Sequence, residues 1–425
     1  MSTAEPPRPQ NRHYVLFMVT LVFVVNYLDR QVLAILLPLI KAEFHVSDSA
    51  LGLLTGPAFV VLYATLGVPL ALMADRINRR NLIAGSLALF SLMTVLCNYT
   101  VSFWQLLAAR VGVGIGEAGT GPSINAIIAD LYPPKERASA LAIYSAGLNV
   151  GLLFAFFGGG WVAQHYGWRM AFLLAGLPGL VLVFLFLFTV EEPKRGHSEG
   201  LADAGAAPGL IATAKVLWRQ RSFRFLSLGT SMSAFGGYAG IAFVPSFLAR
   251  SHEMTPAQIG LLLSVTTGIF GFIGTVLSGI VADRVGRGDI GRSMLVPVVA
   301  TFIGLPFAPV FYLSPNLTLV MIALSIPAFL GASYLGPAYA ATQGLVPLRM
   351  RATAAAILLF VLNMIGLGLG PLGVGILSDV LTPWLHQDAL RWALLSTTIT
   401  SLIGAFFYWQ SSRTLAQDMA RAAAL

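Results

Sequence analysis

The sequence predicts an all-α membrane protein with twelve transmembrane helices, arranged as two six-helix bundles. Of its 425 residues, 56% are hydrophobic and only 10% are charged, and the mean hydropathy is +0.78. Soluble domains carry about 25% charged residues, so composition excludes an ordinary soluble fold. The net charge of +8 is therefore interpreted by loop position, and we expect no nucleic-acid partner.

Each predicted helix rests on an apolar run long enough to cross a bilayer, which takes about 20 residues. Six runs precede a polar, Gly/Ala-rich segment, and six follow it. We expect an N-terminal bundle at 1–190, a cytoplasmic linker at 191–221 and a C-terminal bundle at 222–425. The runs cover residues 13–40, 51–74, 81–99, 102–130, 137–163, 168–190, 222–249, 256–282, 292–313, 316–346, 352–380 and 388–411.

Lys and Arg are distributed between the predicted loops as the positive-inside rule requires. With the N-terminus in the cytoplasm, 20 of them fall on the cytoplasmic side and 4 on the outer side. This ratio supports the span count and predicts that both termini are cytoplasmic. The first run is too long for the apolar region of a signal peptide, so we interpret it as an uncleaved first span. We expect an integral protein of a bacterial inner (cytoplasmic) membrane.

The first run contains an acid and an arginine side by side near its middle, Asp29 and Arg30. Each costs roughly 2.5–3.5 kcal/mol inside a membrane unless it faces a partner or a water-filled path. The two side chains point about 100° apart around the helix, so they do not neutralise each other on one face. Both are expected to find partners on another helix.

The fourth run supplies candidate partners. Arg110 and Glu117 are seven residues apart and therefore share a face two turns apart. The predicted depth of Arg110 matches that of Asp29, which makes the two a candidate pair, and Glu117 is expected to face Arg30 or Arg110. The glycines between them, such as Gly114, would let neighbouring helices approach closely. The network is either a static link between helices or a proton-coupling site, and the second is favoured.

The C-terminal half contrasts with this arrangement, because we expect its six spans to contain no Asp, Glu, Lys or Arg. A central cavity would then be charged on one wall and uncharged on the other, which suits an amphiphile. A sugar carrier would be expected to have polar side chains on both walls. The candidate substrate-binding residues are Tyr27, Arg30, Arg110, Glu117, Phe235, Tyr238, Tyr334, Tyr339 and Asn363.

The sequence contains no pattern typical of an enzyme. The six histidines fall at helix ends or in loops, without a ligand pair at helical spacing, and no P-loop is present. The single cysteine, Cys97, rules out an internal disulfide and a multi-cysteine metal site. We therefore expect no catalytic residues, no metal and no cofactor.

A short charged motif occurs at the same place in both halves. Asp75 and Arg76 follow the second run, and Asp283 and Arg284 follow the eighth, about 208 residues later. At helix ends these groups are expected to form a cytoplasmic gate, in which arginines and a facing helix terminus hold that side shut. The alternative is a solvated turn whose arginines only set the topology.

These motifs resemble those of the major facilitator superfamily, and the resemblance covers essentially the whole chain. The C-terminal copy matches D-R-x-G-R, whereas Ala71 and Asn78 stand where the N-terminal copy usually has glycines. Within the superfamily, N-Y-x-D-R in the first helix, R-V-G-x-G-x-G-E-A in the fourth and P-x-x-R-A-x-A after it resemble Spinster-type lysolipid transporters.

The resemblance implies a monomeric transporter working by alternating access, with its site between the two halves. It further implies a lysophospholipid or similar amphiphile as substrate and a proton gradient as the energy source. Two alternatives stay open: a proton-coupled carrier of drugs or small organic acids, and a passive lipid scramblase without ion coupling. For proton coupling we favour Glu117 as the titrating group, with Asp29 holding Arg30 and Arg110 in position.

Overall fold

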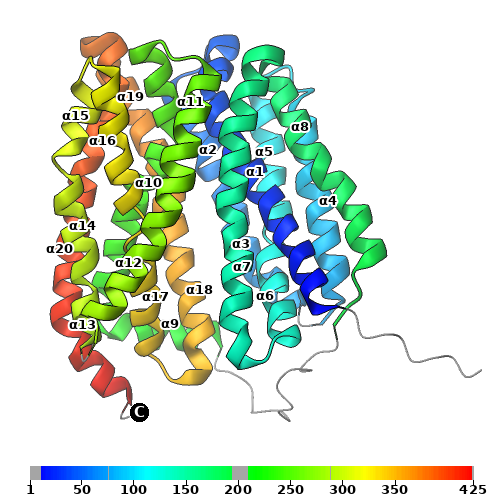
Figure 1. Cartoon of the computed structure of the whole chain (residues 1–425), viewed down its shortest axis with the longest axis vertical. Coiled ribbons are helices and arrows are strands. Elements are labelled where there is room, and N and C mark those ends of the chain that lie inside the picture. The colour runs from blue at the N-terminus through cyan, green and yellow to red at the C-terminus, as the bar shows by residue number, and fades with distance from the viewer. Residues whose placement is uncertain (1–10, 75, 194–208, 288, 424–425) are drawn as a thin grey trace, which may run out of the picture.

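A computed structural model describes residues 11–423 except 75, 194–208 and 288 (Figure 1). All regular elements in these residues are helices. In the N-terminal half they are α1 (Arg12–Phe44), α2 (Asp48–Thr55), α3 (Pro57–Ala74), α4 (Arg79–Cys97), α5 (Phe103–Glu117), α6 (Thr120–Leu131), α7 (Pro134–Leu153), the π-helix η1 (Phe154–Gly158) and α8 (Gly159–Thr189).

The C-terminal half continues with α9 (Leu210–Arg219), which lies inside the predicted linker, and then with a longer series of helices. These are α10 (Arg221–His252), α11 (Pro256–Leu263), η2 (Ser264–Phe270), α12 (Gly271–Val285), α13 (Ile290–Ser293), α14 (Leu295–Gly304), α15 (Phe307–Leu313), α16 (Leu317–Leu330), α17 (Leu335–Gly344), η3 (Leu348–Met350), α18 (Arg351–Leu362), η4 (Asn363–Leu369), α19 (Gly370–Leu385), η5 (His386–Asp388) and α20 (Ala389–Ala423).

Local chemistry explains where the helices start and break. Ser47 and Ser102 cap α2 and α5, because each hydroxyl accepts a hydrogen bond from a first-turn amide. The run 51–74 is divided between α2 and α3 at Gly56, just before Pro57, since proline lacks the amide that would continue the helix. Gly167, with a φ of 84°, kinks α8 between the two predicted runs that this helix joins.

By length and apolarity, eight helical segments of the described residues could each cross a membrane, or nine if α13–α15 form one bent span. Two of the eight, Ser139–Thr189 and Arg351–Ala422, contain 51 and 72 residues. At about 1.5 Å per residue, each is far longer than a single crossing requires. The count of twelve spans stays a prediction.

The two halves stand side by side, with α1–α8 on one side of Figure 1 and α10–α20 on the other. Helix α1 begins and α20 ends at the same end of the molecule. We call this the inner end and the opposite one the outer end, following the orientation predicted from the positive charges. Toward the inner end each half has its own apolar core, around Phe90 and Ile127 in one and around Phe223 and Tyr408 in the other, and Leu367 of η4 also contributes to the first.

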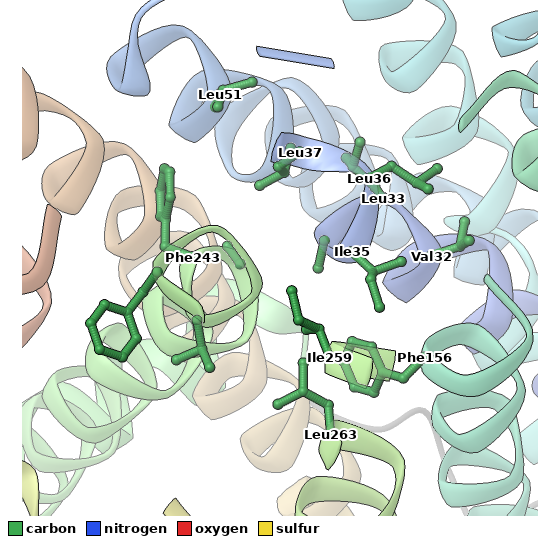
Figure 2. Close-up of a cluster of buried hydrophobic side chains, with 14 of the residues drawn as sticks. Val32, Leu33, Ile35, Leu36, Leu37, Leu51, Phe156, Phe243, Ile259 and Leu263 are labelled. Atoms are coloured by element: carbon green, nitrogen blue, oxygen red, sulfur yellow. The ribbon is translucent and has the colours of Figure 1, made fainter. Parts of the chain in front are cut away.

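A single apolar core joins the two halves toward the outer end. It contains α1 residues such as Ile35, together with Phe156 of η1 and Ile259 and Leu263 of α11, and Figure 2 shows these four side chains gathered together. Among the described residues, the hydrogen bonds between the halves also lie in the outer part of the molecule. The halves are therefore joined at the outer end.

Candidate functional site

The four charged residues predicted to lie within the membrane form two buried ion pairs. Arg30 of α1 donates from Nη2 to Oε2 of Glu117 at 2.5 Å and from Nε to the same oxygen at 3.2 Å. Arg110 of α5 donates from Nη1 to Oδ1 of Asp29 at 3.1 Å. The second oxygen of Asp29 accepts a hydrogen bond from the Thr94 hydroxyl. Asp29 and Arg30 thus point to different partners, as their angular separation requires.

Close packing of α5 against its neighbours sets the position of these charges. A Cβ on Gly114 would overlap the carbonyl oxygen of Phe59 in α3, and one on Gly116 would come within 2.6 Å of the Phe90 amide nitrogen in α4. Only glycine fits at such backbone approaches. The glycines between Arg110 and Glu117 therefore hold α5 firmly against α3 and α4.

Aromatic rings surround the guanidinium of Arg30. Its Cζ atom lies 4.5 Å from the ring centre of Phe59, 5.0 Å from that of Tyr63 and 5.2 Å from that of Tyr27. Such rings attract a cation through their negative faces. Arg30 is therefore held by one carboxylate and three rings, and its release would leave a site suited to another cation.

A cavity of about 480 Å³ lies beside this network, a size within the usual range of small-molecule sites. Its N-terminal wall is formed mainly by α1 and α7, and it extends deeply among the helices of the C-terminal half. Its lining includes Tyr27, Gln31, Asn149, Phe156, Tyr238, Gly240, Val244, Thr267, Ala300, Thr301, Gly304, Phe311, Leu324, Pro327, Tyr334, Thr397, Thr398 and Ser401.

The C-terminal part of this cavity is uncharged and mostly apolar. No Asp, Glu, Lys or Arg of the described chain lines the cavity. Several lining hydroxyls already donate to the backbone of their own helix, as those of Thr301, Thr397 and Thr398 do at 2.7–2.8 Å. These groups have little need of a polar ligand, so this region favours a hydrocarbon chain.

A second, much smaller cavity of about 30 Å³ lies beside the charges. Arg30, Arg110 and Thr55 line it, and Gln31 and Tyr238 border both cavities. The space is large enough for about one water molecule. The guanidinium groups therefore lie next to a large cavity whose lining is uncharged and mostly apolar.

The predicted substrate-binding residues divide into three groups. Tyr27, Tyr238 and Tyr334 line the large cavity, whereas Arg30 and Arg110 line the small one. The remaining four predicted residues line neither cavity. Glu117 and Asn363 are buried, Tyr339 packs against the inner core of the C-terminal half, and the ring of Phe235 faces Gly373 of α19.

The predicted gate residues lie at the inner end of their halves. Asp75 is outside the described residues. Arg76, Asp283 and Arg284 are exposed, and none of them forms an ion pair within the part of the chain that the structure describes.

The expectation that the C-terminal spans carry no charged residue is wrong. The predicted runs contain Arg224, Arg292, Asp379, Asp388 and Arg391, most of them at the ends of the runs. Asp379 lies inside the predicted span 352–380 and inside α19. Its carboxylate accepts hydrogen bonds from the backbone amides of Asp48 and Ser49 at 2.9 and 2.8 Å. The charge is tolerated because it lies at the outer end and caps the first turn of α2.

Sequence reasoning missed Thr94 and the two α3 rings, Phe59 and Tyr63. The spacing of four residues places both rings on one face of α3, where they stack with centroids 5.2 Å apart. That spacing was a usable signal for a paired aromatic surface. Thr94 is one of three hydroxyl residues in α4, with Ser86 and Ser91, and only its contact with Asp29 distinguishes it. The described residues contain no group of three or more potential metal ligands.

The sequence matches the model of the Major Facilitator Superfamily over residues 19–371 and 226–418. An MFS-type efflux pump of Mycolicibacterium smegmatis is 35% identical to it, over 95% of this chain and 93% of that protein. The sphingosine-1-phosphate transporter SPNS2 of Mus musculus is 27% identical, over 94% of this chain and 77% of that protein. By their names, the first relative is an efflux pump and the second is a transporter.

Among solved structures, this chain is similar to the crystal structure of a bacterial homologue of the human lysosomal transporter Spinster. That structure is in an inward-facing and unoccupied conformation. The two chains share 31% sequence identity and superpose with a TM-score of 0.89, over 96% of this chain and 98% of the other.

Proposed function

Because the chain belongs to the major facilitator superfamily and resembles its Spinster members, we propose that it is a proton-coupled secondary transporter working by alternating access. Its substrate is a lysophospholipid or a similar amphiphilic lipid. The protein acts as a monomer in a bacterial inner membrane. It takes its energy from the proton gradient, with no bound cofactor.

The observation that supports this most strongly is the juxtaposition of charge and apolar space. Two arginines lie at the small cavity, which shares Gln31 and Tyr238 with the uncharged large cavity. An amphiphile would place its headgroup near Arg30 and Arg110 and its acyl chain among the C-terminal helices. Burial of the chain would contribute about 0.8 kcal/mol per CH₂, and an anionic headgroup would pair with the guanidinium groups.

Proton coupling is proposed from the charge balance of the buried network, which contains two acids and two arginines. When all four are ionised, their charges cancel. Protonation of Glu117 would release Arg30, whose 2.5 Å contact with that carboxylate is the shortest in the network that joins two ionised groups. Asp29 would remain paired with Arg110 and hold the helices in register.

The direction of coupling depends on the headgroup. If protonation of Glu117 frees Arg30 for an anionic headgroup, the proton and the substrate bind together, which favours symport. If a cationic headgroup competes with the proton for the Glu117 carboxylate, the two exclude each other, which favours exchange. The three rings around Arg30 are compatible with the second case.

Uptake into proteoliposomes tests this function. Purified protein is reconstituted, a pH gradient is imposed, and accumulation of a labelled lysolipid is followed with and without a protonophore. A coupled carrier accumulates the lipid above its equilibrium level and loses that ability with the protonophore. A passive scramblase only equilibrates the lipid under both conditions, and that result would contradict the proposal.

A second candidate function is a proton-coupled carrier of drugs or small organic acids. The similarity to an efflux pump and the uncharged lining of the large cavity favour it. A binding screen on purified protein separates the two candidates. Lysolipids should bind more tightly than organic anions of equal charge, and tighter binding of short organic anions would support the second function.

A further inference from the structure

Two short helices begin at the outer end, and each depends on the opposite half for its first hydrogen bonds. In α2 the amides of Asp48 and Ser49 donate to Asp379 of α19. In α11, which starts with a proline, the amide of Ala257 donates to Oε1 of Gln164 in α8 at 3.1 Å. First-turn amides have no partner within their own helix. Closure of the outer end therefore supplies the missing acceptors.

The two contacts are related by the internal repeat of the chain. Asp379 lies four residues after Gly375, and Gln164 lies four residues after Gly160. A Cβ on Gly375 would overlap the carbonyl oxygen of Asp48, and one on Gly160 would overlap that of Pro256, the first residues of α2 and α11. In both halves, therefore, a glycine lets two helix backbones approach closely, and the side chain four residues later accepts the hydrogen bond.

The helices that receive these caps, α2 and α11, also correspond to each other. Gly52 lies four residues after the start of α2, and Gly260 lies four residues after the start of α11. A Cβ on Gly52 would approach the carbonyl oxygen of Pro371, and one on Gly260 would overlap that of Phe156. Pro371 and Phe156 each precede their capping residue by eight positions. We call these two contacts the α2–α19 seam and the α8–α11 seam.

The two seams differ in charge. The α2–α19 seam contains a buried carboxylate, Asp48, which accepts from Arg250 at 2.6 and 2.8 Å, from Lys41 at 2.6 Å and from Ser378 at 2.7 Å. Arg250 belongs to the C-terminal half and Asp48 to the N-terminal half, so this pair also joins the halves. The acceptor that caps α11 across the α8–α11 seam is a neutral amide oxygen.

We propose that Asp379 and Gln164 are corresponding positioning residues of one outer gate, and that the charged α2–α19 seam dominates its closure. Hydrogen bonds to a carboxylate are roughly twice as strong as those to a neutral acceptor. A carboxylate also suits the positive end of a helix, and its two oxygens serve two amides. Opening the outer end removes both caps together, because each half moves as a packed body.

Amide hydrogen exchange of the detergent-solubilised or reconstituted full-length protein tests this gate. Asp379→Asn keeps one acceptor oxygen but loses the charge and the second acceptor. Exchange at the first-turn amides of α2 should become about tenfold faster or more, since loss of about 1.4 kcal/mol is a factor of ten. Exchange at Ala257 in the other seam should accelerate as well, because gate opening exposes both.

The converse substitution, Gln164→Glu, gives the neutral seam a charged cap and should slow exchange in both seams. The double variant Asp379→Asn/Gln164→Glu should bring exchange back toward that of the native protein. Faster exchange confined to α2 in the Asp379→Asn protein would mean that Asp379 caps its helix without acting on a common gate. If the Asp379→Asn protein fails to fold, the Gln164→Glu protein alone tests the common gate. Unchanged amide exchange at α2 in that protein would overturn the proposal.

The inference rests on the alternating access proposed above, but it does not depend on the substrate. Exchange is measured without lipid and without a pH gradient, so failure of lysolipid transport would leave its outcome unaffected. Conversely, independent opening of the two seams would overturn the common gate and leave the substrate assignment intact.

Discussion

Gly240 of α10 offers a direct way to shorten the apolar part of the cavity. It lines the large cavity, and a Cβ added there would meet no heavy atom within 4 Å. The substitution Gly240→Leu should therefore be accepted at its Cβ, and it adds four carbon atoms at the wall of the cavity. The backbone there is helical, so leucine is not excluded by conformation.

The expected loss follows from the acyl carbons that the new side chain displaces. Four CH₂ groups at about 0.8 kcal/mol each amount to about 3 kcal/mol, which is a factor of about 150 in Kd. This loss applies only to chains long enough to reach the new side chain. The preferred chain length should therefore become shorter by about four carbons.

Binding of a lysolipid series with one headgroup and increasing acyl length measures the effect. The native protein should bind more tightly with each added carbon until the cavity is filled, and the Gly240→Leu protein should reach its plateau earlier. Gly85→Leu is a matched control, because Gly85 of α4 also faces open space but does not line the cavity. Equal binding of a bare headgroup and the full lipid, or identical behaviour of both variants, would refute the reasoning.

Two further predictions concern the charged residues. Asp75→Asn or Asp283→Asn should increase labelling of a cysteine placed on the inner side, because each carboxylate is expected to stabilise the outward-open state; unchanged labelling in both would reduce these loops to topology signals. Asp29→Asn should lower the free energy of unfolding by about 3–5 kcal/mol, because it leaves Arg110 buried without its carboxylate. Adding Arg110→Met should recover much of that loss in a denaturation assay, and fully additive losses would contradict the pairing.

The charged network was the most predictable part of the site. The angle between consecutive helical residues separates Asp29 from Arg30, and matched depth in antiparallel helices brings Arg110 to Asp29. Both arguments use only helical geometry and the cost of an unpaired charge in a membrane. The division of the single predicted run 51–74 into two helices at Gly56 was not predicted, although the following proline removes a helical hydrogen bond.

The residues of the uncharged wall were harder to predict, because residue type does not show which face of an apolar helix points into the cavity. Phe235 and Tyr339 have the chemistry of cavity residues, but they face neighbouring helices instead. Gly240 lines the cavity because it has no side chain to fill the space beside it. That space depends on the positions of the surrounding helices, which the sequence does not show. Asp379 stands in the predicted run 352–380, so its charge was visible, but its role could not be predicted, because it caps a helix of the other half about 330 positions away.

The central claim is that proton uptake by Glu117 drives transport. The most direct measurement compares the native protein with Glu117→Gln in proteoliposomes, following both pH-driven accumulation of a lysolipid and counterflow exchange at equal pH. Glutamine is nearly the same size as glutamate but does not take up a proton in the physiological range. The account predicts that Glu117→Gln abolishes accumulation while counterflow exchange continues. Continued pH-dependent accumulation against a gradient by the Glu117→Gln protein would contradict it and would make Asp29 the next residue to test.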